Sequence, residues 1–117
     1  MLAKVLIGLI AVLHVYILVL EMFLWDKPYG LKAFGNSLEK AQLTKVLAQN
    51  QGLYNGFLAA GLFWSLIAPV GCAVAVANFF LACVLVAGIY GGLTASKKII
   101  YIQAIPALVA LIALNLL

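Results

Sequence analysis

The chain has 117 residues, of which 68% are apolar and 9% charged, and its formal net charge at pH 7 is +4. So few polar side chains cannot cover a water-soluble globule of this length, which indicates a protein solvated by lipid. The positive charge comes from lysines alone, and the absence of arginine and of a basic stripe argues against nucleic acid as a partner.

The first element is an apolar segment over residues 2–24. Its stretch from Val5 to Leu24 makes about 30 Å of helix, the thickness of a bilayer's hydrocarbon core. The length of the segment, its internal His14 and Glu21, and the lack of a small-residue cleavage site favour a retained membrane-spanning helix over a signal peptide.

The polar region over residues 26–48 follows. Apolar residues recur there at helical spacing with polar residues between them, which predicts a short amphipathic helix in the membrane interface, with an ordered loop as the alternative. The apolar positions are Leu31, Phe34, Leu38 and Ala41, and the polar ones are Lys32, Asn36, Glu39 and Lys40.

Three further apolar segments cover residues 49–68, 70–93 and 99–117. Pro69 and Gly71 interrupt a run too long for one crossing, so the chain is expected to reverse there in a very short turn. The sequence therefore predicts an all-α polytopic membrane protein, a single domain over residues 1–117 with four transmembrane helices in a bundle.

The lysines predict the orientation of these helices. Six of the seven lie in the loops over residues 26–48 and 94–98, whereas Lys4 is alone on the other side. By the positive-inside rule both loops are cytoplasmic and both termini lie outside, in a multi-pass protein of the inner (plasma) membrane of the cell.

Polar residues inside the predicted spans mark the candidate site. Ionisable groups are costly within a bilayer unless they face a partner or a wet cavity. We expect a seam of polar side chains from the cytoplasmic face to mid-membrane that binds a ligand. Its members are Glu21, Gln51, Tyr54, Asn55, Tyr90 and Gln103 at one level, with His14 and Asn78 nearer the midplane.

Each polar residue also has a simpler interpretation. His14 can bond a carbonyl or Asn78 as a link between helices, Glu21 can extend to a lysine at the interface, and the amides can be ordinary interhelical contacts. Gly52 and Gly56 form a GxxxG motif, which permits close helix packing within one chain or in a homodimer.

Several motifs are missing. The sequence has no CxxC, HExxH, Walker loop or GxSxG motif, and one histidine cannot build a typical zinc or haem site. We therefore expect no metal or nucleotide cofactor. Cys72 and Cys83 are too far apart on one helix for a disulfide and are expected to be free.

Three sequence blocks carry a resemblance to a known family. They are His-Val-Tyr-Ile at 14–17, Leu-Glu-Met-Phe-Leu-Trp at 20–25, and Asn-Gln-Gly-Leu-Tyr-Asn-Gly-Phe-Leu-Ala-Ala-Gly at 50–61. The chain resembles, over essentially its whole length, small bacterial membrane proteins grouped as domain of unknown function 1304 (DUF1304). The resemblance implies four spanning helices and no particular activity.

The chain is also similar to small multidrug exporters in size, helix count and a glutamate in the first helix. Here, however, Glu21 lies near a membrane face, the same helix carries His14, and the long amphipathic loop has no counterpart in the exporters. These differences argue against proton-coupled antiport.

Three functions are compatible with these patterns. The first is binding of a small lipophilic or cationic ligand in a cytoplasm-facing polar pocket, for transport or sensing. The second is a membrane-embedded enzyme that uses Glu21 and His14 as acid and base on a lipid-soluble substrate. The third is a structural or accessory membrane subunit, and we favour a non-enzymatic role.

Overall fold

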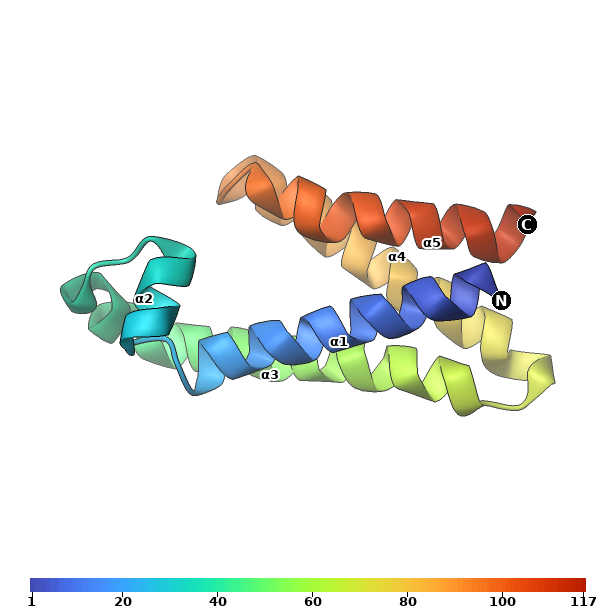
Figure 1. Cartoon of the computed structure of the whole chain (residues 1–117), viewed down its shortest axis with the longest axis horizontal. Helices are drawn as coiled ribbons and strands as arrows, with labels where there is room; N and C mark the ends of the chain where they lie inside the picture. Colours follow the sequence, from blue (N-terminus) through green and yellow to red (C-terminus); the bar gives the residue numbers. More distant parts are fainter. The chain divides into compact units, whose positions relative to one another are not determined.

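The computed structural model describes all 117 residues, and the chain is helical without strands. The elements in order are α1 (Leu2–Met22), α2 (Pro28–Phe34), α3 (Leu38–Ile67), α4 (Val70–Thr94), the π-helix η1 (Ile100–Ala104) and α5 (Ile105–Leu116). Figure 1 labels the five α-helices. The predicted all-α fold class is confirmed.

Two of the four predicted spans have the length and composition needed to cross a membrane, namely α1 and α4. The apolar helix over Ile100–Leu116 is shorter. In α3 the apolar half follows a half rich in lysines and amides, so the helix as a whole is less apolar. Spans in α3 and in η1–α5 therefore stay predictions.

The region between α1 and α3 differs from the single amphipathic helix that we expected. α2 ends at Phe34, and the following Gly35 adopts a left-handed conformation (φ 66°) that terminates the helix. A new helix then begins, and the Ser37 hydroxyl accepts a hydrogen bond from the Lys40 backbone N–H at 3.1 Å as an N-cap. Leu38 and Ala41 thus belong to α3, so the four apolar positions do not share one helix.

The predicted turn between the second and third apolar segments is confirmed. α3 ends at Ile67 and α4 begins at Val70. The carbonyl of Pro69 accepts backbone hydrogen bonds from Cys72 and Ala73, both at 2.9 Å, and so starts the new helix.

The last apolar segment is not a regular α-helix throughout. Pro106 has no N–H to donate to the carbonyl four residues earlier, and the turn before it is a π-helix in which the Ile105 N–H bonds to the Ile100 carbonyl. Gln103, one of the predicted site residues, lies within η1.

The chain forms two compact units, and the boundary between them falls within α1 and α3. Unit 1 comprises Met1–Val12 and Leu58–Leu117. After α4 the chain turns back, so that η1 and α5 run in the opposite direction to α4 (Figure 1). The buried core of unit 1 consists of Ile7, Ile10, Ala11, Leu62, Ala77, Leu81, Val84, Ala107 and Ala110.

Unit 2 comprises Leu13–Phe57 and therefore holds the end of α1, all of α2 and the first two thirds of α3. Glycines allow α3 to approach α1 closely. A Cβ at Gly52 would lie 2.5 Å from Met22 Cγ, and one at Gly56 would lie 2.7 Å from Leu18 Cδ1. The GxxxG motif thus serves contact within this chain, and this contact positions the residues of the candidate site.

Candidate functional site

The centre of the candidate site is a contact between a carboxylate and an amide in unit 2. Asn55 Nδ2 donates a hydrogen bond to Glu21 Oε1 at 2.6 Å. Glu21 lies in the last turn of α1 and Asn55 lies one turn after Gly52 in α3. The absence of a side chain at Gly52 lets the two helix backbones approach, so that the short Asn55 side chain can reach the carboxylate.

Glu21 is only partly engaged by this contact. The hydrogen bond uses Oε1, and Oε2 accepts no hydrogen bond from the chain. The side chain is neither fully buried nor fully exposed. An ionised carboxylate can accept several hydrogen bonds, so Glu21 retains the capacity to accept more from a donor outside the chain.

Two of the residues predicted beside Glu21 are not bound to it. Gln51 and Tyr54 are exposed, Tyr54 by 57%, and neither forms a hydrogen bond with the carboxylate. Successive residues of an α-helix point about 100° apart, so the neighbours of Gly52 and Asn55 are turned away from the face that packs on α1. The predicted polar cluster in unit 2 is therefore smaller than the sequence indicated.

His14 is completely buried in α1. Its separation from Glu21 by seven residues corresponds to about 10 Å along the helix axis. A proton cannot pass directly between side chains at this separation, because hydrogen-bonded atoms lie about 3 Å apart. The two residues share a helix face, as expected, without forming a directly hydrogen-bonded acid–base pair.

Asn78 has a partner that the sequence analysis did not identify. Its Nδ2 donates to Asn115 Oδ1 at 3.1 Å, and Asn115 Nδ2 donates back to Asn78 Oδ1 at 2.7 Å. Each amide also donates to the carbonyl four residues earlier in its own helix. Asn78 therefore links α4 to α5 in unit 1. The signal that we overlooked was a second asparagine in an apolar helix.

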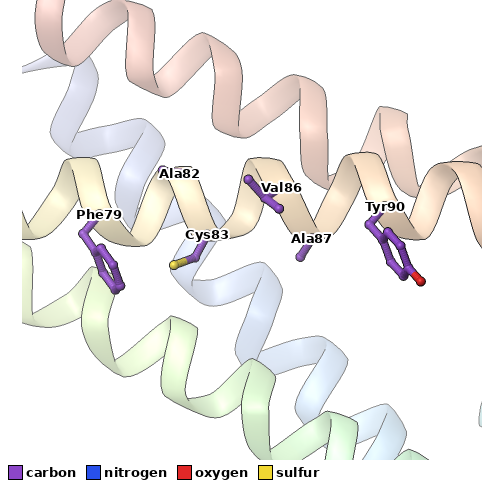
Figure 2. Close-up of a pocket in the computed structure, with 6 residues that line it drawn as sticks. All are labelled: Phe79, Ala82, Cys83, Val86, Ala87 and Tyr90. Atoms are coloured by element: carbon purple, nitrogen blue, oxygen red, sulfur yellow. The ribbon is translucent and has the colours of Figure 1, made fainter.

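Tyr90 and Gln103 also lie in unit 1. Tyr90 is 70% exposed and lies at one end of a shallow groove on α4. Figure 2 shows Phe79, Cys83 and Tyr90 projecting to the same side of this helix. The groove is lined almost wholly by apolar atoms, from Phe79, Ala82, Cys83, Val86, Ala87 and Tyr90. It is a surface of α4 alone and offers a ligand little beyond the Tyr90 hydroxyl.

A set of polar contacts in unit 2 connects α1, α2 and the first two turns of α3. The Trp25 Nε1–H donates to the Thr44 hydroxyl at 3.1 Å, and the Tyr16 and Tyr29 hydroxyls are hydrogen-bonded at 2.5 Å. The Trp25 ring also lies against that of Phe34, with the centroids 4.8 Å apart. These contacts hold the connection between the helices beside the end of α1.

The chain's salt bridge joins this connection to α3. Lys45 Nζ donates to Asp26 Oδ2 at 3.0 Å. This hydrogen bond holds the pKa of Asp26 below its ordinary value of 3.8, and the charges of Lys45 and Lys27 act in the same direction, whereas desolvation opposes them. Asp26 and Thr44 were not among the predicted site residues, because sequence spacing alone does not show which residues of the connection and of α3 meet.

Comparisons with known proteins identify the family. The chain is 31% identical over 107 residues to the uncharacterized protein YpaA of Lactococcus lactis subsp. lactis (strain IL1403), covering 90% of this chain and 89% of that protein. No solved structure matches the chain. The family model described as "Protein of unknown function (DUF1304)" matches residues 8–115, so the chain belongs to the DUF1304 family.

Proposed function

We propose that the chain is a multi-pass integral membrane protein with spans in α1, the apolar part of α3, α4 and η1–α5. The support is the length and composition of α1 and α4 together with large exposed apolar side chains on every one of these helices. Such surfaces promote aggregation in water and are favourable in contact with lipid. That the four spans form one bundle and one domain stays a prediction.

We further propose that Glu21 and Asn55 form the binding site for a small cationic, lipophilic ligand, for transport or sensing. The observation that carries this proposal is the half-satisfied carboxylate. Asn55 occupies Oε1, and Oε2 remains able to accept a hydrogen bond. Ionisable groups within spanning helices are retained mostly where they bind an ion, a ligand or a proton.

The surroundings of the carboxylate favour a ligand with an ammonium group and a hydrocarbon body. An ionised carboxylate only accepts hydrogen bonds, and its bonds to cationic donors are the strong ones. The side chains of Leu18 and Met22 lie where α1 meets Gly52 and Gly56. They provide apolar contacts beside the acid, as ligand sites usually combine apolar walls with a few polar groups.

Access from the cytoplasm follows from the predicted topology. Glu21 is in the last turn of α1, which leads into the lysine-rich connection over residues 26–48. With that connection on the cytoplasmic side, a ligand reaches Glu21 from the cytoplasm.

A structural or accessory role is the second candidate. The reciprocal bonds between Asn78 and Asn115 are the kind of polar contact that holds helices together in a membrane. Together with the bond of each amide to its own helix, they use all the side-chain N–H groups of the pair. An enzyme that relays a proton between Glu21 and His14 has less support, because the two side chains are separated by about 10 Å along α1.

Ligand-induced thermal stabilisation tests the ligand-binding proposal. Octylamine is the cationic probe and octanol its neutral counterpart, each added to the protein in lipid nanodiscs. We expect octylamine alone to raise the Tm of the wild type, because a ligand that binds the folded state stabilises it. Glu21→Gln keeps the size of the side chain but removes its charge, and it should abolish the shift.

Glu39→Gln is the matched control. It removes the same charge from an exposed glutamate in the first turn of α3, so the octylamine shift should persist. An equal shift in Glu21→Gln and in the wild type would contradict the site. An equal shift with octanol would show that the probe partitions into lipid without engaging the carboxylate.

A further inference from the structure

The exposed apolar surface of α3 begins earlier than the span predicted from residue 49. Leu43, Val46 and Leu47 are exposed by 80%, 70% and 69%. Their spacing places them on one helix face. If α3 lies in a bilayer, as proposed above, this face contacts hydrocarbon from about one turn after the start of the helix.

The ion pair makes this depth possible. Lys45 lies among these apolar residues and is the only charged residue between Lys40 and the end of α3. Its salt bridge to Asp26 at 3.0 Å pairs the charge with one of opposite sign. Paired charges are less costly near a membrane than isolated ones. In the bilayer location proposed above, the level of Asp26 and Lys45 therefore falls at the boundary between lipid tails and headgroups.

Three exposed lysines lie within a turn or two of this boundary. Lys27 directly follows Asp26 in the sequence and is exposed. Lys40 is one turn before Thr44, which accepts the hydrogen bond from Trp25. Lys32 is in α2 two residues before Phe34, whose ring lies against Trp25. We call Lys27, Lys32 and Lys40 the lysine rim.

The rim has a net positive charge that nearby acids do not cancel. The segment over residues 26–48 holds four lysines and two carboxylates, which leaves a charge of +2. The charges of Asp26 and Lys45 balance each other in the salt bridge, so the three rim lysines stand against one further carboxylate, Glu39. The exposed rings of Tyr29 and Phe34 lie in the same segment, as is typical of side chains at a membrane interface.

We propose that the lysine rim binds the phosphate groups of anionic phospholipids. This proposal rests on the membrane location proposed above and is independent of the Glu21 ligand. Lysines next to a membrane surface attract anionic headgroups. The exposed apolar face that starts at Leu43 places hydrocarbon beside the rim, and this favours a phosphate attached to a lipid over a free one.

Lipid-dependent thermal stability in detergent tests the proposal. The probes are phosphatidylglycerol, zwitterionic phosphatidylcholine of the same chain length, and inorganic phosphate. Phosphatidylglycerol should raise the Tm of the wild type more than the other two, and added salt should reduce the effect because it screens exposed charges. An equal rise with inorganic phosphate would overturn the lipid assignment.

Two triple variants locate the effect. Replacing the rim with Lys27→Gln, Lys32→Gln and Lys40→Gln should lower the phosphatidylglycerol shift to less than about half. The control, Lys4→Gln with Lys97→Gln and Lys98→Gln, changes the net charge equally at exposed lysines elsewhere, and it should keep the shift. An equal loss in both variants would contradict a site at the rim.

If the rim variant does not fold, Asp26→Asn provides a test in which the lipid effect should increase. This substitution releases Lys45 from its salt bridge and removes a negative charge, so phosphatidylglycerol should raise the Tm more than it does in the wild type. An unchanged or smaller rise in Tm would count against the rim. Glu21→Gln should keep the full lipid shift. A wild type that shows the lipid shift but is not stabilised by octylamine would overturn only the Glu21 site. Release of the wild type from membranes by alkaline carbonate would overturn both proposals.

Discussion

Asn55 donates its side-chain amide to the carboxylate of Glu21 across the contact between α1 and α3, at 2.6 Å. The contact depends on two residues that have no side chain. Gly52 and Gly56 bring the helix backbones together, and one turn after Gly52 the amide meets the acid. Packing and polar chemistry are therefore coupled at this site, and a change in either one should affect the other.

The first prediction concerns Gly52. A Cβ there would lie 3.2 Å from Glu21 Cβ and 3.3 Å from the Leu18 carbonyl oxygen, and backbone atoms cannot move as easily as side-chain ends. Gly52→Ala should lower the free energy of unfolding by about 1–3 kcal/mol, as overpacking generally does, and should weaken octylamine binding. Thermal and denaturant unfolding in detergent measure the first effect.

Two other glycines calibrate this result. At Gly56 the added Cβ would meet only the end of the Leu18 side chain, so Gly56→Ala should cost less than Gly52→Ala. Gly71 has open space around the position of its missing Cβ, so Gly71→Ala should cost nothing. If Gly52→Ala were as stable as Gly71→Ala, the packing of α1 on α3 described above would be wrong.

The second prediction concerns the amide pair of unit 1. Asn78→Leu should destabilise the protein by about 1 kcal/mol, because the loss of an interhelical hydrogen bond within a membrane costs about this much. Asn115→Leu should have a similar effect. The double variant should lose less stability than the sum of the single variants, since both remove the same interaction.

Asn50→Leu is the control for this pair. The Asn50 amide bonds only to the Val46 carbonyl of its own helix, at 2.8 Å, so its replacement should have little effect. Strict additivity of Asn78→Leu and Asn115→Leu would show that the two amides do not interact in the protein in lipid.

The third prediction is a pH dependence at the salt bridge. The hydrogen bond from Lys45 lowers the folded-state pKa of Asp26 below 3.8, so the folded state favours the ionised acid. Its contribution to stability is therefore fully present above the ordinary pKa and is lost as the pH falls through the folded-state value. The Tm of the wild type should exceed that of Asp26→Asn at neutral pH.

This difference in Tm should shrink as the pH falls below 3.8. Melting curves of both proteins over a pH series provide the measurement, with Glu39→Gln as the control for a carboxylate outside the salt bridge. A Tm difference between the wild type and Asp26→Asn that stayed constant through the acidic range would exclude the ion pair as its cause.

The fourth prediction concerns topology. Six of the seven lysines are in the two connections over residues 26–48 and 94–98, so both should be cytoplasmic, and Leu117 should lie outside. A reporter fused at Leu117 and a labelled cysteine in place of Asn36 distinguish the two sides. A cytoplasmic reporter at Leu117, or labelling at position 36 from outside the cell, would reverse the assignment.

The parts of the fold that sequence reasoning reached are those determined by the length of apolar runs and by strong helix breakers. α1 and α4 lie within two residues of the predicted segments, and the turn at Pro69 is where it was expected. The amphipathic region was harder, because the apolar spacing from Leu31 to Ala41 continues across Gly35 although the helix does not. The spacing of apolar residues does not show that Gly35 adopts a left-handed conformation and ends the helix.

The candidate site, like the fold, could be predicted only in part from the sequence. Depth in the predicted spans brought Glu21 and Asn55 together correctly, since Glu21 lies near the end of the first predicted span and Asn55 near the start of the second. Depth does not specify rotation, so Gln51 and Tyr54 were placed beside Glu21 although they point elsewhere. The partner of Asn78 was missed for the same reason, because pairing across helices depends on rotation and register that one sequence does not contain.

The central claim is that Glu21 binds a cationic ligand within the membrane, and a distance measurement tests it most directly. Solid-state NMR on the protein in lipid can report the separation between a ¹³C-labelled Glu21 carboxyl carbon and the nitrogen of ¹⁵N-octylamine. We predict about 4 Å, the separation of a directly hydrogen-bonded ammonium and carboxylate, and loss of the signal in Glu21→Gln. A bound probe with no dipolar coupling to Glu21 would contradict the proposed site.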